Sequence, residues 1–270
     1  MSQAETGSEF RTPLVSRLRS GEIGLALIVK QIRTIDIALA AKTCGFDAVY
    51  VDLQHSTIPE DAAAQISAAA VQCGITPLIR IPKGAYGTAL RLLDSGALGI
   101  VVPEVENAEE AREAVSFCKF APVGRRSNAN RYPQFCYQPL PAAEARRILD
   151  ENTLVICMIE SEAALHNADA IAAVPGVDVV HIGTSDLSSD IGAPGSNMHP
   201  KVLEAVETVV TACKRHNKIP GVGGLGGGDP KHYEEVIRLG ARFFSAGNDW
   251  ALMMSAFQER VKLLRSIKSL

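Results

Sequence analysis

The sequence lacks any run of apolar residues near the roughly 18 needed to span a bilayer. Its first thirteen residues, MSQAETGSEFRTP, also lack the apolar segment of a secretory signal peptide. Basic residues are not in excess, since 27 Lys and Arg stand against 30 Asp and Glu, so the charge balance does not indicate a nucleic-acid partner. We therefore expect a cytoplasmic protein with neither a membrane nor a nucleic acid as its partner.

Cysteines are few and scattered, six in 270 residues, and no two of them form a Cys-x-x-Cys pair. A disulfide framework or a cysteine zinc site would need closer and more regular spacing. Scattered cysteines in a chain of this length are typical of free thiols in a reducing compartment.

One phrase does recur along the chain. A helix-like stretch ends in Gly, and a short β-rich run follows, as in AAKTCGFDAVYVD, RLLDSGALGIVVP, IAAVPGVDVVHIG and EVIRLGARFFSAG. The Gly suits the left-handed position that closes a helix. The run after it is apolar on both faces, which is typical of a strand covered on both sides.

Eight such β-rich runs alternate with segments of helical periodicity; they are residues 24–30, 46–51, 76–81, 98–102, 153–159, 177–182, 218–222 and 242–247. This alternation predicts an α/β fold, a single-domain (β/α)8 TIM barrel over residues 21–270. Residues 1–20 are expected to be a leader and N-terminal segment, and residues 121–152 a loop excursion. A doubly wound sheet is the alternative, but no G-x-G-x-x-G follows the first run.

Polar residues of catalytic types follow several of the predicted strands, at the end of a barrel where active sites lie. They are Asp52, Gln54 and His55 in VDLQHS, Arg80 in LIRIP, Glu160 in MIES, and Asp186 in the turn of HIGTSD. Each one alone could be a solvated surface group, an ion-pair partner or a helix cap. Their convergence on one end of a barrel favours a functional cluster.

The pair Glu160 and Asp186 suggests a hard divalent cation, with water and substrate oxygens as the other ligands. We expect Mg²⁺ or Mn²⁺, with Co²⁺ as a further candidate, because zinc would need more than one rim histidine. Such a cation could chelate a 2-oxo acid, and Arg80 could stabilise the negative charge that develops on its oxygen. His55 is the natural acid/base. Backbone amides near Ser185 and Asp186, at the start of a helix, offer an anion site.

The motifs VDLQHS, LIRIPKG, LLDSGALGIVVP, MIES and IGTSDLS occur in this order along the chain. In these the chain resembles the metal-dependent class II pyruvate aldolases of the HpcH/HpaI type, from about residue 20 to the end. That family includes 2-dehydro-3-deoxyglucarate aldolases, 4-hydroxy-2-oxo acid aldolases and the macrophomate synthase relatives.

The resemblance implies a role for each matching residue. Glu160 and Asp186 correspond to the metal ligands, and Arg80 to the arginine at the pyruvate oxygen. His55 corresponds to the acid/base, Asp94 to its partner carboxylate, and Asp52 to the acid that ends the second strand. Gln54 and the turn from Gly183 through Ser185 to Asp186 correspond to substrate-binding positions.

Two positions depart from the family pattern. Many members have Glu in place of Gln54, and Gln in place of Met158.

The resemblance implies a lyase that forms a pyruvate enolate by retro-aldol cleavage of a 4-hydroxy-2-oxo acid. Oxaloacetate decarboxylation is the close alternative, and a barrel that only binds an oxo acid is another. Acyl-CoA chemistry is also possible on this scaffold, but the sequence shows no basic groove suited to the CoA phosphates. The acceptor specificity is expected to depend on loops such as 121–140.

The last predicted helix bears an apolar stripe formed by Trp250, Met254, Phe257, Val261 and Leu264. Packing against the strands would explain this stripe. The opposing positions Leu252, Met253 and Leu263 are also apolar, however, and would need a second cover. The family resemblance implies a homo-oligomer, a trimer or hexamer, joined through this helix.

Overall fold

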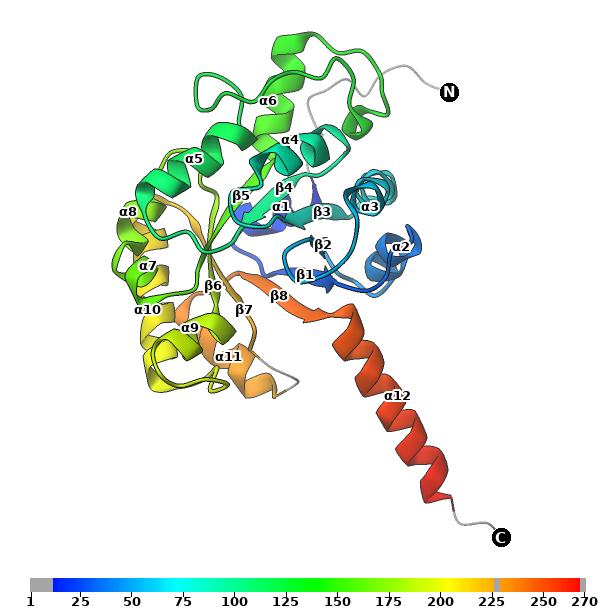
Figure 1. Ribbon diagram of the computed structural model, residues 1–270, viewed down its shortest axis with the longest axis vertical. Coiled ribbons are helices and arrows are strands. Elements are labelled where there is room, and N and C mark those ends of the chain that lie inside the picture. Colours follow the sequence, from blue (N-terminus) through cyan, green and yellow to red (C-terminus); the bar gives the residue numbers. More distant parts are fainter. Residues whose placement is uncertain (1–11, 226–228, 268–270) are drawn as a thin grey trace.

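Eight parallel strands form one closed barrel, in which every strand pairs with its neighbour in sequence and β8 pairs with β1. We describe this fold from a computed structural model, over residues 12–225 and 229–267. Helices surround the barrel on its outside (Figure 1). The predicted (β/α)8 barrel is therefore confirmed, and the doubly wound alternative is wrong.

The bounds of the strands are Gly24–Val29 (β1), Ala48–Asp52 (β2), Thr76–Arg80 (β3), Gly99–Val102 (β4), Leu154–Ile159 (β5), Val179–Gly183 (β6), Ile219–Gly223 (β7) and Phe243–Asn248 (β8). The bounds of the helices are Pro13–Arg19 (α1), Asp36–Thr43 (α2), Glu60–Cys73 (α3), Tyr86–Asp94 (α4), Ala108–Cys118 (α5), Pro133–Phe135 (η1, a 3-10 turn), Ala142–Asn152 (α6), Glu162–His166 (α7), Ala168–Ala172 (α8), Thr184–Asp190 (α9), Pro200–His216 (α10), Pro230–Leu239 (α11) and Asp249–Ser266 (α12).

Local signals in the sequence begin and end these elements as expected. The side chain of Asn107 caps α5 by accepting a hydrogen bond from the Glu110 amide at 3.0 Å. The glycines of the recurring phrase all adopt positive φ; they are Gly45, Gly96, Gly176 and Gly240. Since this conformation is strained for residues with a Cβ, these glycines let each helix turn into the next strand.

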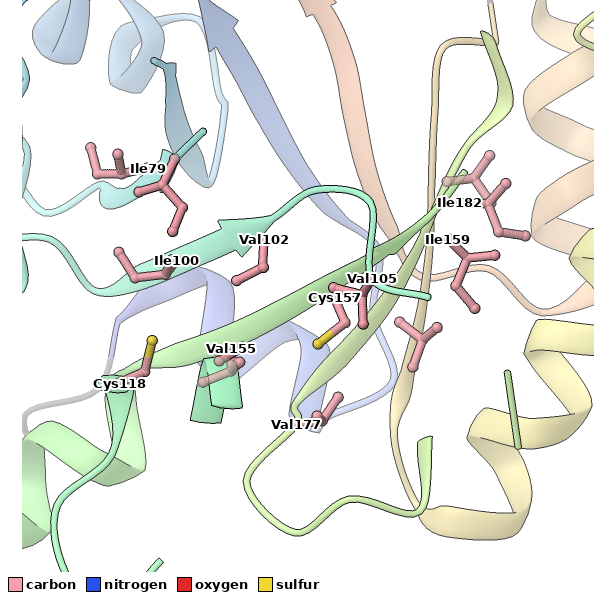
Figure 2. Packing of buried hydrophobic residues seen from close by; sticks show 14 of the residues in the cluster. Ile79, Ile100, Val102, Val105, Cys118, Val155, Cys157, Ile159, Val177 and Ile182 are labelled. Atoms are coloured by element: carbon pink, nitrogen blue, oxygen red, sulfur yellow. The ribbon is translucent and has the colours of Figure 1, made fainter. Parts of the chain in front are cut away.

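Side chains on each strand alternate between two apolar layers, as the period of two along a strand requires. The outer layer lies between the strands and the helices, and Figure 2 shows part of it, including Ile100 of β4 with Val155 and Cys157 of β5. The inner layer fills the barrel; among its members are Ala26, Tyr50, Leu78, Met158, Val179 and Phe243. This alternation decides which residue at each strand end faces the barrel axis.

Helix α1 packs with the inner layer through Leu14, Val15 and Leu18, which are all buried. Residues 13–19, which the sequence assigned to the N-terminal segment, therefore pack against the barrel. The sequence pattern missed this because a seven-residue helix is too short to show clear periodicity.

Helix α12 leaves the barrel and extends away from it (Figure 1). Of its residues only Asp249 is buried, and the side chains of Phe257 and Leu264 are 56% and 58% exposed. The interpretation that its apolar stripe packs on the strands is therefore wrong. Within residues 12–225 and 229–267, no helix combines the length and the apolar character that a membrane crossing requires.

The excursion after residue 120 contains η1 and leads into α6. It follows the end of α5, and each helix after a strand returns the chain to the end where the next strand begins. The excursion thus lies at the opposite end of the barrel from the C-terminal strand ends. Within one chain, the expectation that residues 121–140 shape the acceptor site does not hold.

Candidate active site

A cavity of about 490 Å³ opens at the C-terminal ends of the strands. Its lining residues are Gln54, His55, Glu104, Glu106, Glu160, Ser161, Asp186, Ser189 and Asp190. Five of these nine side chains are carboxylates. A cavity so acidic is suited to hold a cation, because neighbouring carboxylates repel one another unless positive charge lies between them.

Asp52 and Arg80 form a buried ion pair next to this cavity, at the ends of the adjacent strands β2 and β3. Arg80 donates from Nε to Asp52 Oδ1 at 2.9 Å and from Nη2 to Oδ2 at 2.5 Å. Burial by itself would raise the pKa of Asp52, but the hydrogen bonds and charge of Arg80 outweigh it and the pKa lies below its ordinary value. Asp52 therefore stays ionised and fixes the guanidinium.

Beneath this pair, the thioether of Met158 lies 3.9 Å from both the Tyr50 hydroxyl and Nη1 of Arg80. The guanidinium carbon of Arg80 also lies 5.7 Å from the centre of the Tyr50 ring. Met158 is thus a buried residue below the rim, two positions before Glu160 on the same inward face of β5. It supports Arg80 from below.

Glu160 is nearly buried, at 8% exposure, and its Oε2 accepts a hydrogen bond from the Glu104 amide at 2.8 Å. Glu104 has a φ of 53°, a conformation that a non-glycine residue adopts only at some energetic cost. Burial raises the pKa of Glu160, and the charge of Asp186 raises it further, against the lowering effect of the Glu104 amide. Glu160 is therefore a carboxylate that lacks enough positive charge around it.

Asp186 lies in the first turn of α9 and lines the same cavity as Glu160. Gly183 leaves room for the Glu160 side chain beside the start of α9, since a Cβ on Gly183 would lie 2.7 Å from Oε1 of Glu160. Gly183 is also the N-cap of α9 and provides no side-chain acceptor for the first amides of that helix, which include those of Ser185 and Asp186.

The donor set fits a hard divalent cation. Two carboxylates, Glu160 and Asp186, meet at one cavity, and positive charge there would favour the ionised form of Glu160, whose pKa is raised by burial and by Asp186. Elsewhere in the described part of the chain, as here, no three His, Cys, Asp or Glu side chains are grouped closely enough to hold a metal ion. A two-carboxylate set leaves positions for water and substrate oxygens, as Mg²⁺ and Mn²⁺ require.

His55 and Gln54 lie in the turn after β2, where both backbone amides donate to Asp52 Oδ1, at 3.1 and 3.0 Å. The His55 side chain is exposed at the cavity. The Gln54 side chain donates to Glu104 Oε1 at 3.1 Å. The side-chain amide of Gln54 thus connects the turn after β2 to Glu104, whose backbone amide binds Glu160. A glutamate at position 54 would instead repel the Glu104 carboxylate.

Asp94 does not join this group within one chain. It is the last residue of α4. Leu98, just beyond it, donates its backbone amide to the Pro77 carbonyl oxygen near the start of β3, so Asp94 lies near the N-terminal ends of the strands. Its carboxylate pairs with Arg126 at 2.9 Å. The role at His55 that the family resemblance implies would therefore require an Asp94 from a second copy of the chain.

Sequence reasoning missed several groups of the site. Glu104 and Glu106 follow β4 in VVPEVE, so the rule that selected the other strand ends could have found them. Lys30 ends the first predicted run, and its Nζ lies 3.4 Å from Asp52 Oδ2. No local signal indicated His181, a buried residue of β6.

A model of the HpcH/HpaI aldolase/citrate lyase family matches residues 32–256. The 4-hydroxy-4-methyl-2-oxoglutarate aldolase tasA of Hapsidospora irregularis is 35% identical over 96% of this chain and 97% of its own length. The 2-keto-3-deoxy-L-rhamnonate aldolase of Salmonella gallinarum is 29% identical over 95% and 94%.

Solved structures agree with these matches. An HpcH/HpaI aldolase from Desulfitobacterium hafniense has a TM-score of 0.89 at 28% identity, over 96% of this chain and 98% of that one. Macrophomate synthase shares the fold, with a TM-score of 0.78 at 24% identity over 97% and 94%.

Proposed function

This chain belongs to the HpcH/HpaI aldolase/citrate lyase family, and we propose that it cleaves a 4-hydroxy-2-oxo acid to pyruvate and a second carbonyl compound. It is a carbon–carbon lyase of the class II aldolase type. The observation that carries the proposal is the convergence of His55, Glu160 and Asp186 on one acidic cavity, with the charge of Arg80 acting on Glu160 from beside it.

A divalent cation, Mg²⁺ or Mn²⁺ with Co²⁺ as a further candidate, would be held by Glu160 and Asp186. When bound, it would polarise the keto group of the substrate as a Lewis acid. Its binding competes with protonation of Glu160, whose pKa is raised. Metal affinity should therefore fall as the pH drops through that pKa.

Arg80 stabilises the negative charge that builds up on the keto oxygen as the carbon–carbon bond breaks. Its guanidinium is held in place by Asp52 on one side and by Met158 and Tyr50 below. Because these contacts already fix the side chain, little reorganisation is needed during the reaction. The amides of Ser185 and Asp186 at the start of α9 would bind the carboxylate of the 2-oxo acid.

His55 is the base for the 4-hydroxyl group. It removes the hydroxyl proton, the O–H electron pair forms the new C4 carbonyl, and the C3–C4 bond breaks. The electron pair of that bond moves to C3 and gives the enolate of pyruvate, which becomes pyruvate when a proton returns to C3. The two products together contain all the atoms of the substrate, so no oxidant or reductant is required.

The decisive experiment measures pyruvate release from a panel of 4-hydroxy-2-oxo acids. EDTA should abolish the activity, and Mg²⁺, Mn²⁺ or Co²⁺ should restore it. Glu160→Gln and Asp186→Asn should each weaken metal binding, because a neutral amide is a poorer ligand for a hard cation. Glu235→Gln is the matched control, since Glu235 lies on α11 outside the cavity and pairs with Arg238 at 2.6 Å. Full activity in metal-free enzyme would refute the proposal.

Oxaloacetate decarboxylation is the second candidate, because Arg80 and a cation held by Glu160 and Asp186 would stabilise the same enolate when CO₂ leaves. That reaction needs no base at a 4-hydroxyl group. His55→Ala should therefore reduce aldol cleavage by about 10²- to 10⁴-fold, as is usual for loss of a general base. Decarboxylation should survive better. Equal losses would recast His55 as a binding residue.

The proposal also includes an assembled, cytoplasmic enzyme. All six cysteines are free thiols, which fits a reducing compartment. The apolar residues of α12 are exposed in the single chain and would be covered in a trimer or hexamer.

A further inference from the structure

Lys30 follows β1 and continues the inward alternation of that strand. Ala26 and Ile28 lie with the inner layer of the barrel, and Lys30 comes next in this series. Its backbone is held firmly, since Asp249 accepts hydrogen bonds from the amides of Lys30, Gln31 and Ile32 at 3.0, 2.9 and 2.9 Å. The side chain is 28% exposed, so it is partly withdrawn from water.

The ammonium group of Lys30 shares its carboxylate partner with Arg80. Its Nζ lies 3.4 Å from Asp52 Oδ2, but Asp52 already accepts two hydrogen bonds from Arg80. Two cations therefore share one carboxylate at the ends of the three adjacent strands β1, β2 and β3. Withdrawing an ammonium group from water without a matching anion is unfavourable. An anionic ligand would complete this group.

The proposed reaction places such an anion here. The pyruvate part of the substrate lies between Arg80 on β3 and the carboxylates of Glu160 and Asp186 near β5 and β6. His55, the base at C4, follows β2, which is the neighbour of β1. The other substituents of C4 thus lie toward the β1–β2 side, where Lys30 is the inward-facing cation. The cavity wall offered by Glu104, Glu106 and Asp190 is negatively charged and would repel an anion.

We propose that Lys30 binds a carboxylate group on C4 of the substrate, so that the carbonyl compound released with pyruvate is itself a 2-oxo acid. This inference rests on the proposed lyase function and narrows its substrate class. The substrates named for the two relatives above differ in this respect, since 4-hydroxy-4-methyl-2-oxoglutarate carries a carboxylate on C4 and 2-keto-3-deoxy-L-rhamnonate does not. Lys30 selects the first class for this chain.

The test compares two substrates in the metal-loaded enzyme. One is 4-hydroxy-4-methyl-2-oxoglutarate, and the other is 4-hydroxy-2-oxopentanoate, whose C4 carries only a methyl group and hydrogen. Lys30→Met should lower the ratio of their kcat/KM values about 10- to 100-fold, the scale of a lost hydrogen bond to a charged group. Lys30→Arg should recover part of the ratio. Lys83→Met is the control, because Lys83 already binds the Glu104 carbonyl oxygen at 2.9 Å and is 46% exposed.

Binding provides a second measurement that needs no turnover. Lys30→Met should weaken binding of the dianion 2-oxoglutarate but change pyruvate binding little. An unchanged substrate ratio together with unchanged 2-oxoglutarate binding would overturn the inference, as would a wild-type enzyme that cleaves only the substrate without a carboxylate on C4. A wild-type enzyme that cleaves neither substrate with metal present would refute the lyase proposal itself.

Discussion

Asp52 accepts four hydrogen bonds, two from Arg80 and one each from the amides of Gln54 and His55. These bonds stabilise the charged form, which is why the pKa of Asp52 is lowered in spite of its burial. At the residue scale, this favours Asp52 as a positioning residue that orients Arg80 and the His55 turn. In the proposed mechanism, His55 carries out the proton transfer.

Arg80→Lys should lower turnover about 100-fold or more, the usual loss when a donor to a developing oxyanion is removed. A lysine keeps the charge, but it cannot reproduce the two parallel hydrogen bonds to Asp52 and still face the substrate. Steady-state kinetics with metal present would measure this. Arg91→Lys, which alters an exposed arginine paired with Glu60, should leave turnover unchanged. Wild-type turnover in the Arg80 variant would show that Arg80 is only a structural partner.

The buried His181 leads us to predict that the protein loses stability in acid. Burial lowers its pKa to about 3, with a smaller contribution from the charge of Arg80. In the unfolded chain the imidazole titrates near pH 6.5, so below that pH the unfolded state binds a proton that the folded state does not. The contribution of His181 to the free energy of unfolding is therefore complete above about pH 6.5. It falls as the pH drops toward 3, by up to about 1.4 kcal/mol per pH unit.

His181→Leu should remove this contribution. Denaturant unfolding of both proteins between pH 4 and 7, in EDTA so that metal binding does not contribute, would give the two slopes. His216→Leu is the control, because His216 is a surface histidine bound to Asp169. If the slopes for the wild type and His181→Leu coincide, His181 titrates normally in the folded protein.

At the scale of elements, the close approach of β5, β6 and α9 forms the part of the site that we propose holds the metal. Gly183 ends β6, caps α9 and leaves room for the Glu160 carboxylate. Glycines of β7 allow similar contact inside the barrel, since a Cβ on Gly223 would lie 2.7 Å from Nε2 of His181. The glycine-rich segment VGGLGGG thus serves close packing up to Leu225, while residues 226–228 lie outside the described part of the chain.

Gly183→Ala should weaken metal binding at least about tenfold, or roughly 1.4 kcal/mol. The new Cβ would displace the Glu160 carboxylate, from which it would lie only 2.7 Å away. Titration with Mn²⁺ would measure the affinity directly. Gly87→Ala is the matched control, since a Cβ there would lie 3.8 Å from its nearest neighbour, Nη1 of Arg91. An unchanged Mn²⁺ affinity in Gly183→Ala would mean that Glu160 is not a ligand.

At the scale of the whole molecule, α12 is the element that a single chain does not cover. Its start is anchored through Asp249 to the turn after β1. Beyond that point apolar side chains are exposed on more than one face; Trp250, Leu252, Phe257, Val261, Leu263 and Leu264 are each 48–58% exposed. Contiguous apolar surface of this kind marks an interface in soluble proteins. The role implied for Asp94 also requires a second chain.

Truncation after Phe257 should therefore give smaller oligomers in light scattering. The barrel should still fold, because residues 258–267 are all exposed in the single chain. Activity should fall if the helix of a neighbour helps to close the site. Lys262→Ala, at a polar position of the same helix, should leave the assembly intact. A wild-type protein that is monomeric at micromolar concentration would refute the assembly proposal.

The sequence by itself determined the eight strands and the residues at their ends. Each predicted run agrees with an observed strand to within two residues, because the apolar runs and the glycines between them act locally. Asp52, Arg80, Glu160 and Asp186 could be selected in the same way, since the position of a residue at a strand end follows from the run before it.

Only the tertiary structure decided which of these groups meet. The amide of Glu104 on the Glu160 carboxylate, Lys30 beside Asp52, and Asp94 beside Arg126 join residues 22 to 56 positions apart. Such contacts depend on the register of neighbouring strands and on which end of the barrel a helix terminus reaches. The exposure of α12 was equally hidden in the sequence, because an apolar stripe has the same pattern whether it covers its own barrel or another subunit.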